Sequence, residues 1–247
     1  AASDVYKRQD SDSSIGMKKG LMILWIISGW GVLHISAQET YAIEWQVDSS
    51  SVENLKVVKN EKSADIEKQN FTSSKLYQMT FVGTPLIVTG MIVKGEDTHF
   101  RSLRNDYMQQ FHRPFDNYTQ FLPAAVMLGM KVAGVESRSS WGRMLASDAF
   151  SAAIMGAVVN TMKTTTHVMR PDGSNDHSFP SGHTATAFMT ATMLTKEYGH
   201  LSPWIGIGSY TIASGTGLMR MANNKHWLSD VMTGAGIGIL SVEFGYY

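Results

Sequence analysis

Apolar stretches recur along the second part of the chain, and polar or Pro- and Gly-containing breaks separate them. Alternation of β-branched and polar residues is weak there, whereas Ala, Met and Gly are common, which favours helices over strands. Breaks such as Lys94–Asp97, Glu136–Arg138 and Arg170–Gly173 would end the helices. The pattern predicts an all-α fold, a helical bundle of about six core helices at 76–93, 120–135, 146–162, 183–196, 202–219 and 229–247.

The N-terminal part of the chain has a different character, with one apolar run in an otherwise polar sequence. The basic stretch Met17–Gly20 precedes the apolar stretch Leu21–Leu33, and Ala37 offers a small residue for cleavage. We interpret residues 17–37 as a signal peptide, with an uncleaved N-terminal anchor as the alternative. The protein is therefore expected to be exported, to the periplasm or to a membrane of the cell envelope.

The segments on either side of this signal lack a sustained apolar face. Residues 1–16 are polar and precede the start signal, and we interpret them as foreign to the native sequence. Residues 38–75 are rich in Ser, Lys, Glu and Asn, a composition typical of a polar tail or linker. The remaining residues, 76–247, are predicted to form a single domain.

The hydropathy of the predicted helices does not favour a conventional six-span membrane protein. Two uncharged runs, Leu76–Val93 and Tyr198–Met219, approach the roughly 20 residues that a bilayer requires. The other runs are shorter or carry Lys131, Asp148 or Glu243, and the mean hydropathy of the chain is −0.11. We expect a helical bundle on the periplasmic side of the membrane, either soluble or seated in the outer leaflet.

Net charge and cysteine content exclude several classes of function. The 21 Lys and Arg residues balance the 21 Asp and Glu residues, so no broad electrostatic attraction to nucleic acid is expected. The absence of Cys excludes disulfides, thiolate metal sites and cysteine nucleophiles. The sequence also has no carboxylate cluster and no His-x3-His pair of the kind that holds a catalytic metal. Neither a metal nor another cofactor is therefore expected.

The first candidate cluster combines two cations near the end of a predicted helix. Lys163 and Arg170 are seven residues apart, so in a helix they would share one face. Pro171 disfavours helical geometry at Arg170, which places that guanidinium at the helix end. Two cations on one face suit an oxyanion, which Arg can bind with two hydrogen bonds. Taken alone, such a pair is more often an exposed basic face.

The second cluster, Phe179–Thr184, has the features of a helix N-terminus that binds an anion. Ser181 is a good N-cap for a helix that runs to Met193. Gly182 lets the backbone approach a ligand closely, and the free N–H groups of a first helical turn bind anions without a metal. His183 would lie at the mouth of this site, placed to donate a proton to a leaving oxygen. Taken alone, the same residues are usually just a helix cap.

The third cluster contains Arg220, His226 and Asp230. Asp230 follows His226 by four residues, so the two would face the same way in a helix. A carboxylate bonded to one imidazole nitrogen fixes the tautomer and leaves the other nitrogen as a nucleophile. Arg220 would add a third cation for a phosphate. A metal half-site and an ordinary surface pair are the alternatives.

In chain order, the three clusters spell Lys-x6-Arg-Pro, Pro-Ser-Gly-His and Arg-x5-His-x3-Asp. This combination resembles the type 2 phosphatidic acid phosphatase (PAP2) superfamily, which includes bacterial nonspecific acid phosphatases and vanadium haloperoxidases. The resemblance covers about 76–247 and implies a PAP2/haloperoxidase-like helical core. The chain departs from the family pattern at Met219, where a Ser usually precedes the motif's Arg.

The resemblance implies a metal-free phosphatase with a phosphohistidine intermediate. His226 would attack phosphorus, oriented by Asp230, and His183 would protonate the leaving alcohol and later activate water. The phosphate oxygens would be bound by three cations, a hydroxyl and a backbone N–H, from Lys163, Arg170, Arg220, Ser181 and Gly182.

The sequence leaves the substrate and several functions open. The leading hypothesis is a phosphatase for a phosphate monoester or diphosphate of an envelope lipid, such as phosphatidate, an isoprenyl diphosphate or a lipid A phosphate. A soluble periplasmic nonspecific acid phosphatase that hydrolyses small phosphate esters is the second hypothesis, and a vanadium-dependent haloperoxidase the third. A phosphate-binding module without activity is less favoured, because binding alone does not require His226 paired with Asp230.

Overall fold

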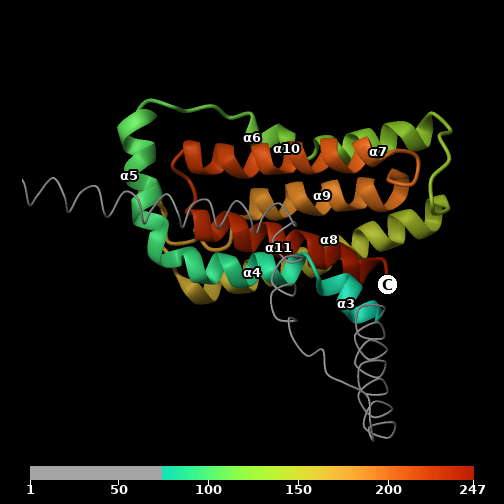
Figure 1. The fold of residues 1–247 in the computed structure, drawn as a ribbon, viewed down its shortest axis with the longest axis horizontal. Helices are drawn as coiled ribbons and strands as arrows, with labels where there is room; N and C mark the ends of the chain where they lie inside the picture. Colours follow the sequence, from blue (N-terminus) through green and yellow to red (C-terminus); the bar gives the residue numbers. More distant parts are fainter. Residues whose placement is uncertain (1–73) are drawn as a thin grey trace, which may run out of the picture. The chain divides into compact units, whose positions relative to one another are not determined.

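A computed structural model describes residues 74–247. Residues 1–16, the predicted signal peptide and nearly all of the predicted tail lie outside the described range. Within it the chain is helical and contains no β-strand, which confirms the predicted all-α class (Figure 1). The helices are α3 (Lys75–Thr80), α4 (Gly83–Ile92), the 3-10 helix η2 (Val93–Glu96), α5 (Asp97–Tyr107), α6 (Asp116–Thr119), α7 (Leu122–Val132), α8 (Trp141–Thr166), α9 (Gly182–Tyr198), α10 (Pro203–Ala222) and α11 (Leu228–Gly245).

Each of the six predicted stretches is helical, but two helices were not predicted from the sequence. The first stretch breaks at Phe81 and Val82 into α3 and α4. The segment 97–107 forms α5, whose inward side carries Asp97, Phe100 and Arg104. Because two of these three residues are charged, the apolar pattern does not reveal this helix. The short helix α6 likewise lies in a stretch without an apolar run.

Helix α5 is held by hydrogen bonds to the ends of two other helices. The Asp97 carboxylate accepts from Ser229 twice, from the backbone N–H at 3.0 Å and from the hydroxyl at 2.5 Å. Arg104 Nε donates to the carbonyl of Ala222 at 2.9 Å. Asp97 thus satisfies the N–H of Ser229 in the first turn of α11, and Arg104 satisfies the carbonyl of Ala222 in the last turn of α10. Polar contacts therefore fix α5 beside the α10–α11 connection.

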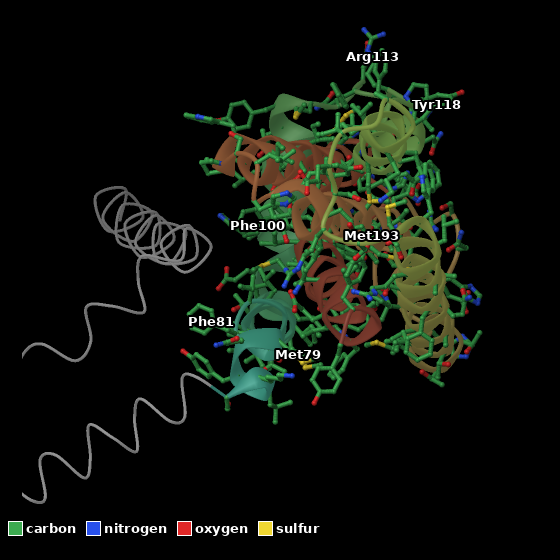
Figure 2. The ribbon with its side chains drawn as sticks, turned by 90° about the vertical axis from the view of Figure 1, so that its right-hand side faces the viewer. Met79, Phe81, Phe100, Arg113, Tyr118 and Met193 are labelled. Atoms are coloured by element: carbon green, nitrogen blue, oxygen red, sulfur yellow. The ribbon has the colours of Figure 1, made fainter. Side chains whose placement is uncertain are left out.

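Helices α9 and α11 form the centre of the bundle (Figure 1). Helix α11 packs against α4, α8 and α9, and α9 also packs against α7 and α10. The interior contains Met193 of α9, which is 4% exposed, whereas Tyr118 at the periphery is 75% exposed (Figure 2). Burial of such apolar side chains supplies the main driving force for assembling these helices.

Glycines let α11 approach its neighbours at backbone distance. A Cβ added to Gly236 would lie 2.5 Å from the carbonyl oxygen of Gly83 in α4, and one added to Gly238 would collide with the carbonyl of Ala185 in α9. A Cβ at Gly234 would lie 2.5 Å from the carbonyl oxygen of Ser181. The first turn of α11 is thereby brought against the start of α9.

Four helix ends meet at one end of the bundle, the left end in Figure 1, beside α5. Helices α8 and α10 finish there, and α9 and α11 begin there. The three sequence clusters lie at the α8 end, the α9 start and the α10–α11 connection, so the fold gathers them in one place. The two helix N-termini also direct their positive dipole ends to this region.

Among the described helices, one is long and apolar enough to cross a membrane by length and composition. It is α8 (Trp141–Thr166), with a mean hydropathy of 1.3 over an 18-residue window of which 17% is buried. The sequence pointed instead to Leu76–Val93 and Tyr198–Met219. The first of these runs is broken between α3 and α4, and the second is split between the end of α9 and α10. The two breaks, between α3 and α4 and between α9 and α10, are not visible in the hydropathy of the sequence.

Candidate active site

The N-terminus of α9 has the predicted cap. The Ser181 side chain accepts from the N–H of Thr184, as a Ser N-cap does. The backbone N–H of Ser181 donates to the carbonyl of Asp230 at 3.0 Å, which joins the starts of α9 and α11. Ser181 is fully buried. The hydroxyl therefore has a structural partner already, and its contact with a phosphate stays a prediction.

Lys163 reaches this N-terminus from the last turn of α8. A Cβ placed on Gly182 would lie 3.9 Å from Lys163 Cε and 3.8 Å from Val159 Cγ1, both ordinary contacts. The Lys163 ammonium donates to the carbonyl of His177 at 2.8 Å. Burial, assisted by the charge of Arg170, lowers the pKa of Lys163 to about 8.

Arg170 does not share a helix with Lys163, and this sequence prediction was wrong. Helix α8 ends at Thr166, because His167 adopts the left-handed conformation with φ 47°. Arg170 is held in the following loop, where its N–H donates to the carbonyl of Asn175 at 2.9 Å. Loop folding, rather than helical periodicity, brings the two cations together.

The predicted pairing of His226 and Asp230 is present but arises in a different way. His226 precedes α11 and is not helical, since α11 begins at Leu228. Asp230 caps this helix by accepting from the N–H of Trp227 at 2.9 Å through Oδ2. The same oxygen lies 3.2 Å from His226 Nδ1. A helix cap, not a helical four-residue repeat, therefore aligns the pair.

The environment of His226 favours a neutral imidazole. His226 is 2% exposed, and burial lowers its pKa to about 4, against the opposing effect of Asp230. Nδ1 donates its proton to Asp230, so Nε2 carries the lone pair. A buried, neutral and oriented imidazole is a competent nucleophile near neutral pH.

Ser178 also contacts this pair, which the sequence analysis missed. Its hydroxyl donates to Asp230 Oδ2 at 2.5 Å and lies 3.4 Å from His226 Nδ1. Ser178 is fully buried, and its N–H donates to the carbonyl of Val168 at 2.9 Å. No local pattern signals this contact, because Ser178 precedes Asp230 by 52 residues.

The three predicted cations are close enough to repel one another. Burial and the charge of Arg220 lower the pKa of Arg170, and both guanidinium groups lower the pKa of Lys163. In the described part of the chain, Nε of Arg170 and Nε of Arg220 are buried without a hydrogen-bond partner. Buried donors normally have partners, so unpaired cationic donors indicate a place for an anion.

Arg220 and His183 each have a partner on the short helix α6. Arg220, 7% exposed, donates from Nη1 to Asp116 Oδ2 at 2.5 Å. His183 Nε2 lies 2.9 Å from Asn117 Oδ1. Burial, followed by the charge of Arg220, lowers the pKa of His183 to about 4. His183 is therefore neutral near pH 7.

Two contacts tie the loop that carries Arg170 to the loop that carries His226. Lys225 and Asp172 form an ion pair at 2.6 Å. Burial favours a higher pKa for Asp172, but hydrogen bonds from Lys225 and Ser174 outweigh it and hold that pKa at about 2. Trp227 Nε1 donates to the carbonyl of Met169 at 2.8 Å. These contacts fix the two loops relative to each other.

An apolar hollow of about 400 Å³ adjoins His226. Helix α5, the end of α10 and the flanking loops line it, with side chains that include Phe100, Met108, Phe111, Leu218 and Met219. Met219, which departs from the family motif, thus adds apolar surface beside the candidate nucleophile. Arg101 lies near the hollow, with its guanidinium 5.7 Å from the centre of the Trp227 ring.

The structure brings all eight predicted site residues to one end of the bundle, although their chemical roles stay predictions. Across the residues that the structure describes, no group of three or more His, Asp or Glu side chains is arranged to hold a metal ion. The arrangement combines a buried histidine with three cations and the start of a helix. It is suited to chemistry on a phosphate.

Comparison with known proteins agrees with this geometry. The model of the PAP2 superfamily matches residues 144–247. The lipid A 1-phosphatase of Porphyromonas gingivalis is 46% identical over 164 residues, which cover 66% of this chain and 37% of that protein. The chain therefore spans little more than a third of that relative's length.

Two solved structures are also similar to this chain. The crystal structure of Aquifex aeolicus LpxE matches with 20% identity and a TM-score of 0.45, over 58% of this chain and 92% of that one. A transmembrane PAP2-type phosphatidylglycerolphosphate phosphatase from Bacillus subtilis matches with 18% identity and a TM-score of 0.42, over 68% and 94%. Residues 144–247, which the PAP2 superfamily model matches, contain all three motifs that the fold brings to one end of the bundle.

Proposed function

We propose that this protein is a phosphatase that removes a phosphate group from an envelope lipid, by way of a phosphohistidine on His226. The observation that carries the proposal is the neutral, buried imidazole of His226, which Asp230 orients beside three cations, two of which, Arg170 and Arg220, have a buried unpaired donor. The relative named lipid A 1-phosphatase supports a lipid A phosphate as the substrate.

The first step transfers the phosphoryl group to the enzyme. The phosphate oxygens bind Lys163, Arg170 and Arg220 together with first-turn N–H groups of α9, which neutralise the charge in the transition state. The Nε2 lone pair of His226 forms a bond to phosphorus while the bond to the leaving oxygen breaks. His183 gives its proton to that oxygen, so the lipid departs as an alcohol.

The second step releases phosphate. Water attacks phosphorus, and His183, now neutral, accepts a proton from it. The phosphorus–nitrogen bond breaks and its electron pair returns to Nε2 of His226. Both histidines are then ready for another turnover, and the cations and helix N–H groups have supplied the charge stabilisation. No step in this scheme requires a metal.

His183 must carry a proton to act as the acid in the first step. Burial and the charge of Arg220 lower the pKa of His183 to about 4. A bound phosphate ester brings negative charge next to His183, which raises the pKa of the imidazole and favours its protonation. The proposal therefore couples substrate binding to protonation of the general acid and places the optimum on the acid side of neutrality.

The apolar hollow beside His226 supports a lipid over a small phosphate ester. Its lining offers burial for part of a hydrocarbon group attached to the phosphate. Apolar side chains also remain exposed on the outer helices, among them Ile92 of α4 (74%) and Phe150 of α8 (59%). Exposed apolar surface of this kind supports association with a membrane, where such substrates reside.

The decisive experiment is a substrate panel assayed with the purified full chain and two variants. Lipid A with a 1-phosphate, phosphatidate, an isoprenyl diphosphate and p-nitrophenyl phosphate would be compared by phosphate release. We expect the highest kcat/KM on lipid A. The variant His226→Ala should lose nearly all activity and yield no phosphoenzyme on rapid quench, whereas His200→Ala, at an exposed histidine, is the matched control.

Each alternative gives a different result in this panel. Preference for p-nitrophenyl phosphate would favour the nonspecific acid phosphatase. Bromide oxidation by the vanadate-loaded protein with peroxide, together with no phosphate release, would favour the haloperoxidase. Normal turnover by His226→Ala would overturn the proposed mechanism for every substrate.

A further inference from the structure

We infer that helix α6 is a positioning element of the active site, in which Asp116 holds Arg220 and Asn117 orients His183. The inference rests on the proposed function and extends it to residues outside the three motifs. Helix α6 also lies outside residues 144–247, which the family model matches. It comprises four residues between α5 and α7.

Asp116 is the buried counter-charge of Arg220. It is 1% exposed, and its two oxygens have different partners. Oδ2 accepts from Arg220 Nη1 at 2.5 Å, and Oδ1 accepts from Asn223 Nδ2 at 3.1 Å. Asn223 in turn exchanges hydrogen bonds with the backbone of Arg113, at 2.9 Å and 2.7 Å. The network ties the segment before α6 to the end of α10.

This contact decides how Arg220 is presented to a phosphate. Asp116 occupies Nη1 of the guanidinium, while Nε is buried and unpaired within the described structure. Because the fork is planar, fixing one corner fixes the direction of the other donors. Asp116 also offsets the repulsion that Arg220 experiences from Arg170 and Lys163.

Asn117 determines which nitrogen of His183 can exchange a proton with the substrate. Asn117 Oδ1 only accepts hydrogen bonds, so the contact at 2.9 Å requires a proton on Nε2 of His183. Nδ1 is then the nitrogen whose proton is given to the leaving oxygen and later regained from water. The Nε2–H bond to Asn117 persists in both protonation states, so the ring keeps its orientation through the cycle.

Further contacts anchor α6 to the helices that carry these two residues. The Thr119 hydroxyl lies 2.9 Å from that of Thr216 on α10. The Thr190 hydroxyl on α9 donates to the carbonyl of Gln120 at 2.9 Å, and Gln120 Nε2 donates to the carbonyl of Asn117 at 3.0 Å. Helix α6 therefore bridges α9 and α10 at the point where His183 and Arg220 enter the site.

The pH dependence of the reaction provides a readout that a merely structural role would not move. Four charged groups shift the pKa of His183. Arg220 of α10, and His226 and Arg170 of the loops, lower it, whereas Asp116 of α6 raises it. Loss of the acceptor on Asn117 lowers the pKa of His183. His183 is then deprotonated at a lower pH, so the reaction rate falls at a lower pH. A carboxylate at position 117 instead raises the pKa of His183 and moves this fall in rate to a higher pH.

The experiment compares Asn117→Ala, Asn117→Asp and Asp116→Asn in the full chain, on the best substrate of the panel. Asn117→Ala should lower kcat by roughly 10-fold to 100-fold with little change in KM, a part of the ~10²–10⁴-fold that a general acid contributes. The alkaline limb of the pH–rate profile should shift to lower pH for Asn117→Ala. For Asn117→Asp it should shift to higher pH, by roughly one unit. Asp116→Asn should raise KM as well, because it releases Arg220.

Asn160→Ala in α8 and Asp106→Asn in α5 are the matched controls, since both residues are exposed. Asn117 is exposed, so its variants are expected to keep the unfolding temperature of the parent protein. Unshifted alkaline limbs in both Asn117 variants, with His226→Ala inactive, would overturn the inference but leave the proposed function intact. Full activity in His226→Ala would instead overturn the proposed function.

Discussion

The two oxygens of the Asp230 carboxylate have unequal surroundings. Oδ2 accepts from the Trp227 N–H and the Ser178 hydroxyl and lies 3.2 Å from His226 Nδ1, whereas Oδ1 is buried without a partner in the described structure. Three contacts on one oxygen fix both the start of α11 and the ring of His226. A change at Ser178 is therefore expected to act through orientation of the nucleophile.

Gly182 offers a residue-scale test of how closely the phosphate approaches α9. No protein atom outside the glycine's immediate neighbourhood lies within 3.4 Å of the position that a Cβ would take; the nearest, Val159 Cγ1, is 3.8 Å away. Gly182→Ala should therefore leave the unfolding temperature unchanged or slightly raised, because Ala favours a helix. It should raise KM by roughly 10-fold, about 1.4 kcal/mol of lost binding, because the methyl group occupies the path of the phosphate.

Steady-state kinetics and thermal unfolding of the same preparation measure both effects. The prediction fails if KM stays at the parent value while the protein remains folded. That result would place the phosphate away from the first turn of α9.

The element on which the site depends most is α11. Its glycines let it contact α4 and α9 at backbone distance, and its first turn carries Asp230. Helix α5 and helix α6 add polar contacts to the ends of α10 and α11. Packing along the helices and hydrogen bonds at their ends therefore act together to place the candidate catalytic groups.

Gly236→Ala tests the packing of α11 against α4. The added Cβ would lie 2.5 Å from the carbonyl oxygen of Gly83 and 2.6 Å from Ile87 Cγ1, so the helices must separate. We expect a loss of roughly 1–3 kcal/mol in the free energy of unfolding. Gly156→Ala in α8 is the control, since nothing lies within 4 Å of its Cβ; it should stabilise by about 0.5–1 kcal/mol.

Thermal unfolding followed by circular dichroism distinguishes the two variants. An unfolding temperature for Gly236→Ala equal to that of Gly156→Ala would show that α4 and α11 are not packed as described.

At the scale of the described domain, four helix ends bring three cations, a capped helix N-terminus and a buried imidazole into one place. In the proposed reaction, side chains and backbone dipoles from α8, α9, α10 and the loops between them would supply the positive charge that phosphoryl transfer requires. The carboxylates near the site are engaged by protein groups, Asp116 with Arg220 and Asp230 with Trp227. Among the described residues, neither belongs to a group of three or more His, Asp or Glu side chains that could hold a metal ion.

We therefore expect catalysis to be independent of divalent metal. Exhaustive treatment with EDTA should leave phosphate release unchanged, and vanadate should inhibit competitively as a mimic of the five-coordinate transition state. A metal-dependent phosphatase treated in parallel verifies that chelation is complete. Loss of activity that Zn²⁺ or Mg²⁺ restores would contradict this prediction.

The sequence by itself determined the features that depend on residues close together along the chain. Composition and periodicity predicted the all-α fold and the six main helices, because apolar spacing reflects which side of a helix is buried. The Ser181 cap was predicted because capping depends on residues a few positions apart. The motifs identified the residues that meet at the site, and the family match over 144–247 confirmed the resemblance.

Only the tertiary structure decided the contacts between distant segments. Arg220 bonds Asp116 across 104 residues, His183 bonds Asn117 across 66, and Ser178 bonds Asp230 across 52. Arg170 joins Lys163 through a loop rather than along a helix face, and His226 meets Asp230 through a cap. The physical reason is that these contacts depend on how helices and loops that are distant in the sequence pack against one another in space. Periodicity within a single helix carries no information about that packing.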